Sequence, residues 1–305
     1  MPYPALEELV APARPRCALW RLVLGLGLVL VVYIGWLLAV FAVLLAVSGG
    51  HGGHEWPARI VEGDGPITTL LILASFVGMG IGPLLAARLV HRRAMASLFG
   101  PRARLVRDFA VALGVCAVLY GLSALVPSAI VPDRNLSIGL WLSLLPLAVL
   151  GVLIQTGAEE ILFRGYIMTQ LAARFSARVV WMVLPSAAFA LLHFEPGLYG
   201  GAAAWMVVGA VFLFALLAAD LTAHTGSIGA AWGFHFANNL GAILFVGAKG
   251  PLAGLALYTV TLDRAGFRQL APIVIVDMLV LVAVWATIRA VLGRYGRDDS
   301  GAPSK

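Results

Sequence analysis

The sequence has little charge for its length. Of its 305 residues, 12% are charged and 61% are hydrophobic, whereas soluble globular domains carry about 25% charged residues. The apolar residues come in runs long enough to cross a bilayer, and they do not alternate with polar residues as they would in a transmembrane barrel. This shortage of charge excludes a soluble domain and predicts an all-α, polytopic membrane protein.

Cysteine and lysine are also scarce. The two cysteines, Cys17 and Cys116, lie far apart in the sequence, so there is no disulfide framework. The lysines are Lys249 and Lys305, and arginine supplies the rest of the positive charge behind the net charge of +6. In a membrane protein such an excess sets topology, so we expect no nucleic-acid partner. The preference for arginine, alanine and glycine hints at a bacterial source.

The apolar residues form eight segments. Each is close to the ~20 residues that cross a bilayer as a helix, although the fifth is short. The segments cover residues 18–47, 67–90, 106–126, 138–160, 178–194, 201–221, 227–247 and 270–292. We therefore predict a helix bundle with about eight transmembrane helices. Residues 1–305 are expected to form a single integral membrane domain, in which the polar residues 293–305 are a disordered cytoplasmic tail.

Basic residues are distributed unequally over the connections between these segments. One set of alternate connections holds Arg14, Arg16, Arg92, Arg93, Arg102, Arg104, Arg107, Arg174, Arg178, Arg294, Arg297 and Lys305, and the other holds Arg59, Arg134, Lys249, Arg264 and Arg268. Basic residues concentrate on the cytoplasmic side of a membrane. We therefore expect a multi-pass protein of the plasma membrane with both termini in the cytoplasm.

Three charged residues interrupt the apolar pattern in the stretch GAEEILFRGYI, residues 157–167. A charge near the bilayer centre costs ~2.5–3.5 kcal/mol on insertion scales, so such residues face the protein interior and mark functional sites. Glu160 and Arg164 are four residues apart on one helical face, which predicts an ion pair. Glu159 points about 100° away and has no local basic partner, so it is a candidate general base. A buried polar knot with a structural role is the alternative.

Further polar residues occur in the following segments. His193 ends the fifth segment, and His235 and Asn239 are four residues apart on one face of the seventh. In an antiparallel hairpin of the fourth and fifth segments, Glu159 and His193 are each about sixteen residues from the turn. At ~1.5 Å rise per residue they reach nearly the same level. This spacing favours one shared polar site over separate core histidines, provided that the fourth helix runs unbroken toward Arg174.

The three motifs resemble those of a known family. Residues 159–164, EEILFR, fit an EExxxR motif; residues 189–193, FALLH, fit FxxxH; and residues 235–239, HFANN, fit HxxxN. In this order they are similar to the motifs of the CAAX-prenyl protease and bacteriocin-processing family, also called CPBP or Abi intramembrane proteases. The similar region covers about residues 138–247 and implies a catalytic core in helices four to seven.

The resemblance implies an intramembrane endopeptidase that acts on a peptide or membrane-protein substrate within the lipid bilayer. It implies that Glu159 and His193 orient and deprotonate the attacking water. His235 and Asn239 would then stabilise the oxyanion of the tetrahedral intermediate, and the ion pair predicted above would hold the site together.

The same residues allow an alternative that uses a metal. Glu159, His193 and His235 could supply three ligands to a catalytic zinc ion with water in the fourth place. However, the HExxH signature is absent, and Asn239 is a poor zinc ligand but a good oxyanion donor. We therefore expect no metal cofactor and keep zinc as the alternative.

Two functions other than proteolysis are compatible with buried charges. A proton-coupled transporter would bury glutamate and histidine in its spans, but transporters often consist of two similar halves, and the halves of this sequence do not resemble each other. A membrane scaffold without catalytic activity has no need to bury these residues. The polar set therefore favours the endopeptidase.

Overall fold

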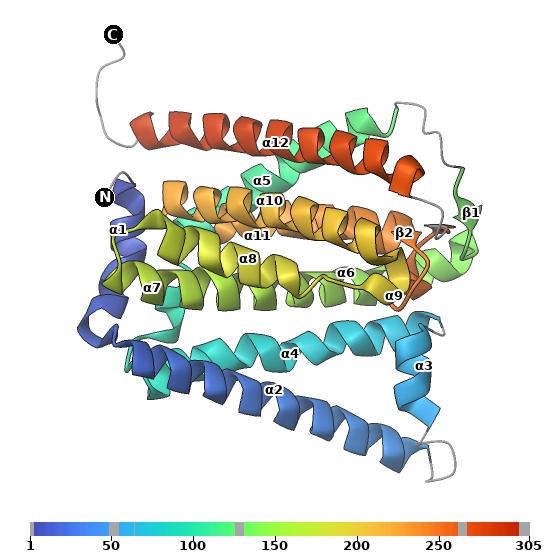
Figure 1. Ribbon diagram of the computed structural model, residues 1–305, viewed down its shortest axis with the longest axis horizontal. Coiled ribbons are helices and arrows are strands. Elements are labelled where there is room, and N and C mark those ends of the chain that lie inside the picture. The colour runs from blue at the N-terminus through green and yellow to red at the C-terminus, as the bar shows by residue number, and fades with distance from the viewer. Residues whose placement is uncertain (1–2, 49–54, 64, 126–130, 262–266, 299–305) are drawn as a thin grey trace.

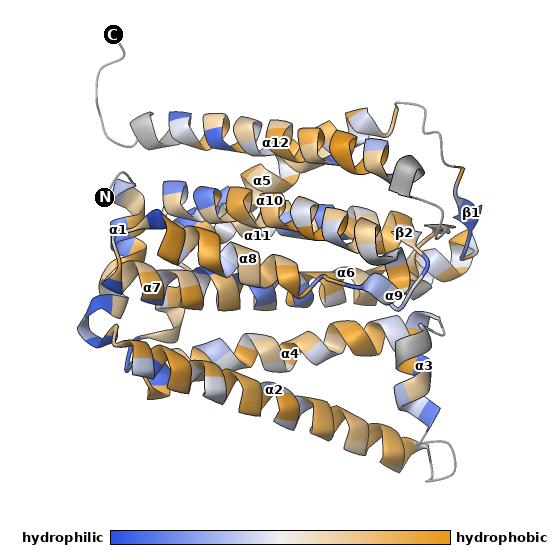
Figure 2. Cartoon of the chain, in the orientation of Figure 1, coloured by the Kyte–Doolittle hydropathy of each residue, from blue (hydrophilic) through white to orange (hydrophobic). Residues whose placement is uncertain are grey.

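A computed structural model of the chain describes residues 3–48, 55–63, 65–125, 131–261 and 267–298. This part of the chain is almost entirely helical, and most of the long helices run along the same axis of the molecule (Figure 1). Hydrophobic residues dominate the helices, including those on the outside of the bundle (Figure 2). The prediction of an all-α, polytopic membrane bundle is confirmed.

Six helices in the described residues are long and apolar enough to cross a membrane. They are built from α2 (Leu19–Val47), α4 (Pro66–Leu89), α5 (Arg102–Ser123), α6 (Ile138–Glu160), α10 (Gly201–Thr225) and α12 (Phe267–Asp298). These six fit a multi-pass membrane protein. The predicted number of eight spans is not confirmed, because two of the eight apolar segments form shorter helices.

The shorter helices correspond to the fifth and seventh apolar segments. They comprise the π-helix η5 (Val179–Val183) with α8 (Leu184–Leu191), and α11 (Gly229–Leu240) with the π-helix η6 (Gly241–Phe245). Most residues of α11 are buried, and this helix packs against α5, α6 and α10. The seventh segment is therefore an interior helix.

The fourth helix continues beyond α6. A π-helix, η4 (Ile161–Met168), and α7 (Thr169–Arg174) extend it in one continuous helical run to Arg174. The fourth helix therefore runs unbroken to Arg174, as the predicted hairpin of the fourth and fifth segments requires. In a π-helix each hydrogen bond spans five residues, and such segments are frequent at functional sites. Here the π-helix starts directly after Glu160.

A small sheet, which the sequence did not predict, lies at one end of the bundle. Its strands are β1 (Asp133–Arg134), β2 (Val246–Ala248) and β3 (Tyr258–Val260) in the order β1-β3-β2. β1 is antiparallel and β2 parallel to β3. We call this the sheet end; α3 (Trp56–Glu62) and α9 (Pro196–Tyr199) lie at the same end (Figure 1).

The remaining short elements and the end of the last helix complete the fold. The short elements are α1 (Pro4–Val10) and the 3-10 helices η1 (Ala11–Arg16), η3 (Met95–Leu98) and η7 (Ala253–Leu255). The expectation of a disordered tail from residue 293 is wrong for residues 293–298, because α12 continues to Asp298. Residues 299–305 lie outside the described residues.

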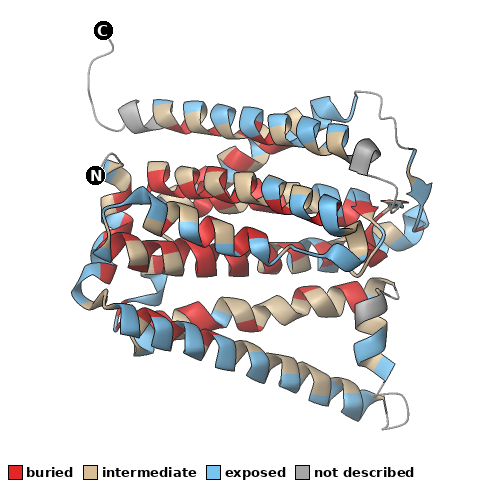
Figure 3. Ribbon diagram, viewed as in Figure 1, coloured by how far each residue is buried: buried red, intermediate tan, exposed pale blue. Residues whose placement is uncertain are grey.

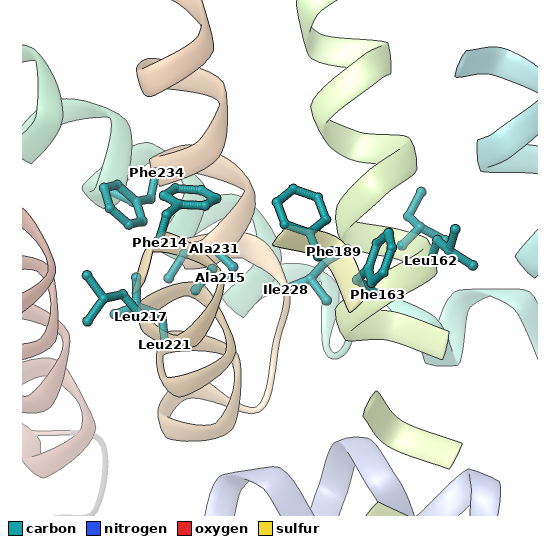
Figure 4. Close-up of a cluster of buried hydrophobic side chains, with 14 of the residues drawn as sticks. Leu162, Phe163, Phe189, Phe214, Ala215, Leu217, Leu221, Ile228, Ala231 and Phe234 are labelled. Carbon is teal, nitrogen blue, oxygen red and sulfur yellow. The ribbon is translucent and has the colours of Figure 1, made fainter. Parts of the chain in front are cut away.

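The core lies around α6, η4, α10 and α11, where buried residues are concentrated, whereas α2 and α12 expose much of their surface (Figure 3). Aromatic rings fill this core: Phe163 lies near Phe189, and Phe214 lies near Phe234 (Figure 4), with ring centroids 5.0 and 4.9 Å apart. The cluster surrounds the helices that carry the three sequence motifs, so packing fixes their relative positions.

Two buried residues that follow α4, His91 and Arg93, form hydrogen bonds with the helical run of η4 and α7. His91 Nε2 lies 2.8 Å from the Tyr166 hydroxyl, and Arg93 donates from Nη1 to Thr169 Oγ1 at 3.1 Å. Burial lowers the pKa of His91, and it lowers the pKa of Arg93 to about 10. Arg93 therefore remains charged at neutral pH. These bonds anchor the part of η4 and α7 that follows the EExxxR motif in the chain.

The direction of insertion can be tested with reporters. We expect a reporter fused after Lys305 to be cytoplasmic and one inserted in the loop at His51–Glu55 to be external, because basic residues favour the cytoplasmic side. In agreement with a common side for both termini, α1 and the C-terminal end of α12 lie at the same end of the bundle (Figure 1). Protease protection of the fused reporter in inside-out vesicles would contradict the orientation.

Candidate active site

Polar side chains meet where α6 and α11 pack together. Glu160 Oε1 accepts a hydrogen bond from Arg164 Nη1 at 2.8 Å and contacts His235 Nδ1, also at 2.8 Å. All three residues are at most 4% exposed. The ion pair predicted from the spacing of Glu160 and Arg164 is confirmed. We call Glu159, Glu160, Arg164 and His235 the Glu–His cluster.

The guanidinium of Arg164 is fixed by more than its carboxylate partner. Its Nη2 donates to the Ala215 carbonyl of α10 at 3.2 Å. Its Cζ atom also lies 4.9 Å from the centroid of the Phe189 ring, which is a cation–π distance. Arg164, which lies in η4, therefore connects η4 with α8 and α10 and keeps Glu160 oriented toward His235.

Glu159 finds its partner on another helix. His235 Nε2 lies 3.4 Å from Glu159 Oε2, while Nδ1 of the same ring contacts Glu160. Glu159 is 8% exposed, and its Oε2 accepts no hydrogen bond from the described protein atoms. Buried polar atoms normally have a hydrogen-bond partner. This oxygen is therefore free to accept a hydrogen bond from a water molecule or a substrate.

Asn239 lies one helical turn after His235 and also faces α6. Its Nδ2 donates to Gln155 Oε1 at 2.9 Å, and Gln155 is 6% exposed. Gln155 lies one turn before Glu159, so α6 and α11 face each other with polar groups over two turns. Gln155 was not among the predicted site residues, although its spacing of four residues from Glu159 was an available signal.

His193 lies beside the cluster without touching it. The residue is half-buried in the turn after α8, and its Nδ1 is 3.0 Å from the Phe189 carbonyl. In the described part of the chain no hydrogen bond or ion pair connects it with Glu159 or His235. The Phe189 ring lies close to both histidines, with centroid distances of 4.9 Å to His193 and 5.9 Å to His235. Phe189, the first residue of the FxxxH motif, therefore links the two histidines through its ring.

The candidate zinc ligands do not form a metal-binding set. Across the described ranges, no group of three or more His, Cys, Asp or Glu side chains is arranged to hold a metal ion. Glu159, His193 and His235 are therefore not gathered into such a three-ligand set in the described residues.

Comparisons with known proteins agree with the three motifs. Residues 138–241 match the family described as "Type II CAAX prenyl endopeptidase Rce1-like". The chain is also similar to the "Uncharacterized protein YyaK" of Bacillus subtilis (strain 168). The two are 25% identical over 293 residues, which cover 92% of this chain and 96% of that protein. No solved structure matches the chain.

The matched region coincides with the site described above. It begins at the start of α6 and ends directly after α11, so it contains the Glu–His cluster, His193 and Asn239. The match supports an intramembrane endopeptidase of the CAAX type. Residues 138–241, which include the polar centre of this membrane bundle, are therefore similar to the Rce1-like family.

Proposed function

We propose that this protein hydrolyses a peptide bond within the membrane by means of a water molecule activated by Glu159 and His193, without a metal ion. The observation that carries the proposal is the buried Glu159 Oε2, which accepts no hydrogen bond from the described residues and lies 3.4 Å from His235 Nε2. A buried carboxylate that can accept a proton beside a histidine is suited to general base catalysis.

Glu159 and His193 carry out the attack step. Glu159 accepts a proton from water, and the oxygen of that water forms a bond to the carbonyl carbon of the substrate. His193 orients the water: donation from its Nδ1 to the Phe189 carbonyl leaves Nε2 as an acceptor. When the tetrahedral intermediate collapses, the peptide C–N bond breaks and the proton held by Glu159 passes to the departing amine.

The oxyanion is stabilised from α11. His235 donates from Nε2 while Glu160 holds its Nδ1, an arrangement that fixes the ring. Asn239 donates with the amide hydrogen that is not engaged by Gln155. Donors that are already oriented toward developing charge need no rearrangement during the reaction, which is why they accelerate it.

The setting of the reaction is also part of the proposal. We place the protein in the plasma membrane of a bacterium with both termini in the cytoplasm, in accordance with the distribution of arginine. Its substrates are peptides or membrane proteins whose cleaved segment enters the bundle between the helices of the Rce1-like region.

The absence of a metal requirement can be tested directly on the purified protein. We expect hydrolysis of an internally quenched, randomised peptide pool to persist after dialysis against a chelator, because Glu159 and not a metal activates the water. Elemental analysis should find far less than the about one zinc ion per chain that a catalytic zinc site requires.

The contradicting result is equally specific. Stoichiometric zinc, whose removal stops hydrolysis and whose return restores it, would replace the metal-free mechanism by the zinc alternative. Loss of zinc in His193→Ala and His235→Ala would then identify two ligands. A chelator can also inhibit by damaging the micelle, in which case adding zinc does not restore hydrolysis. Light scattering, which reports the size of the micelle, separates this effect from loss of a metal.

A further inference from the structure

We propose, on the basis of the function proposed above, that the substrate binds as an extended strand added to the free edge of β2. Strand addition joins a peptide to an exposed sheet edge through main-chain hydrogen bonds, while pockets along the edge select side chains. The proposal defines where the peptide lies relative to the Glu–His cluster and which feature of the peptide is recognised.

A cavity of about 270 Å³ lies against β2 at the sheet end. One wall consists of Val246, Gly247 and Ala248, which are the whole of β2, and His193 contributes to the same cavity. Leu198 and Tyr199 of α9 also line the cavity, and Figure 1 shows α9 and β2 at this end.

The cavity borders the edge of β2 rather than one face of the sheet. Successive side chains of a strand point to opposite faces, so a cavity on one face would touch alternate residues, whereas this one touches three consecutive residues. Its lining includes no residue of β3, the strand that pairs with β2 on the other side. In the described residues β2 ends the sheet on this side. The Val246 N–H is bonded to the Gly241 carbonyl of η6, and no other strand of the described ranges pairs with the outer edge of β2.

The same stretch of chain carries both the strand edge and the proposed oxyanion donor. From Asn239 the chain passes through η6 directly into β2, which starts at Val246. Ala242 and Ile243 of η6 also line the cavity. A peptide paired with β2 therefore continues along η6 toward Asn239, and it passes His193 on the way.

The cavity also indicates what kind of side chain the peptide carries. Its lining is mostly apolar, and Glu195 is its acidic residue. Glu195 is exposed, so its carboxylate is available to a basic side chain. We therefore infer a peptide with small or β-branched residues and a lysine or arginine that reaches Glu195.

The experiment measures binding to the full-length Glu159→Gln protein in detergent micelles, so that hydrolysis does not interfere. The probe is a fluorescein-labelled ten-residue peptide of alternating valine and threonine with one central lysine. Each variant of the peptide carries a single N-methyl group, which removes one main-chain donor. Strand addition predicts a loss of affinity of about tenfold at every second position, whereas the positions between them bind normally.

A second experiment exchanges the charges of the peptide lysine and of Glu195. Replacing the lysine of the peptide by glutamate should weaken binding, and the protein variant Glu195→Lys should restore it. Equal effects of N-methylation at neighbouring positions, or no saturable binding of the unmethylated peptide, would overturn strand addition. The wild-type protein, measured before turnover, repeats the series if the Glu159→Gln protein does not fold.

These outcomes are distinct from failure of the proposed chemistry. If affinity falls at every second N-methylated position but the wild-type protein does not hydrolyse peptides, the β2 site is supported and the catalytic proposal is refuted. If the wild-type protein hydrolyses peptides but the affinity shows no such alternation, the catalytic proposal is supported and the β2 site is refuted.

Discussion

Glu159→Gln is expected to lower kcat by ~10²–10⁴-fold, the range that general base catalysis contributes, while the protein still folds and inserts. Glutamine keeps the size of the side chain but cannot accept a proton from water. The effect is measured as hydrolysis of the internally quenched peptide pool by purified protein, and thermal unfolding in the same detergent reports folding.

Glu160→Gln should act in a different way. Its carboxylate contacts Arg164 and His235 in a buried position, and removal of one partner of a buried ion pair costs ~3–5 kcal/mol. We therefore expect a lower unfolding temperature in this variant, with the loss of activity following from the loss of structure.

A matched control makes the same chemical change outside the site. Glu8 forms an exposed ion pair with Arg104, and exposed pairs contribute about 0–1 kcal/mol, so Glu8→Gln should retain both activity and stability. Wild-type turnover by folded Glu159→Gln protein would refute the assignment of Glu159 as the base.

Asn239→Ala is expected to lower kcat by ~10²–10³-fold with little change in KM, because loss of one oxyanion donor has this effect in other enzymes. The donor acts on charge that develops only in the transition state, so the binding of the ground-state peptide is little affected. Steady-state kinetics on one peptide selected from the pool separate the two constants.

Two neighbouring variants distinguish donation from positioning. Asn238→Ala removes the adjacent amide, which contacts Asn239 at 3.4 Å, and should have a much smaller effect on kcat. Gln155→Ala leaves the donor in place but removes the acceptor that orients it, so it should reduce kcat by about tenfold, within the range that a lost positioning contact costs. An unchanged kcat in folded Asn239→Ala protein would exclude an oxyanion role.

The sequence by itself determined the features that depend on composition and on local helical geometry. Scarcity of charge and long apolar runs were sufficient for a helical membrane bundle, because a bilayer forces the backbone to satisfy its own hydrogen bonds. The Glu160–Arg164 pair followed from a spacing of four residues on one helix, and this contact requires no knowledge of other helices. The lengths of the apolar runs did not separate true spans from interior helices, because both are apolar.

Only the tertiary structure decided how the site is assembled. His235 reaches Glu160 across 75 residues of sequence, and Asn239 reaches Gln155 across 84; such contacts depend on how α6 and α11 pack. The placement of Phe189 near both His193 and His235 depends in the same way on the packing of α8 and α11 against α10. The sheet at the end of the bundle could not be predicted from the sequence either, because its strands are two or three residues long and β1 pairs with a strand far away in the chain.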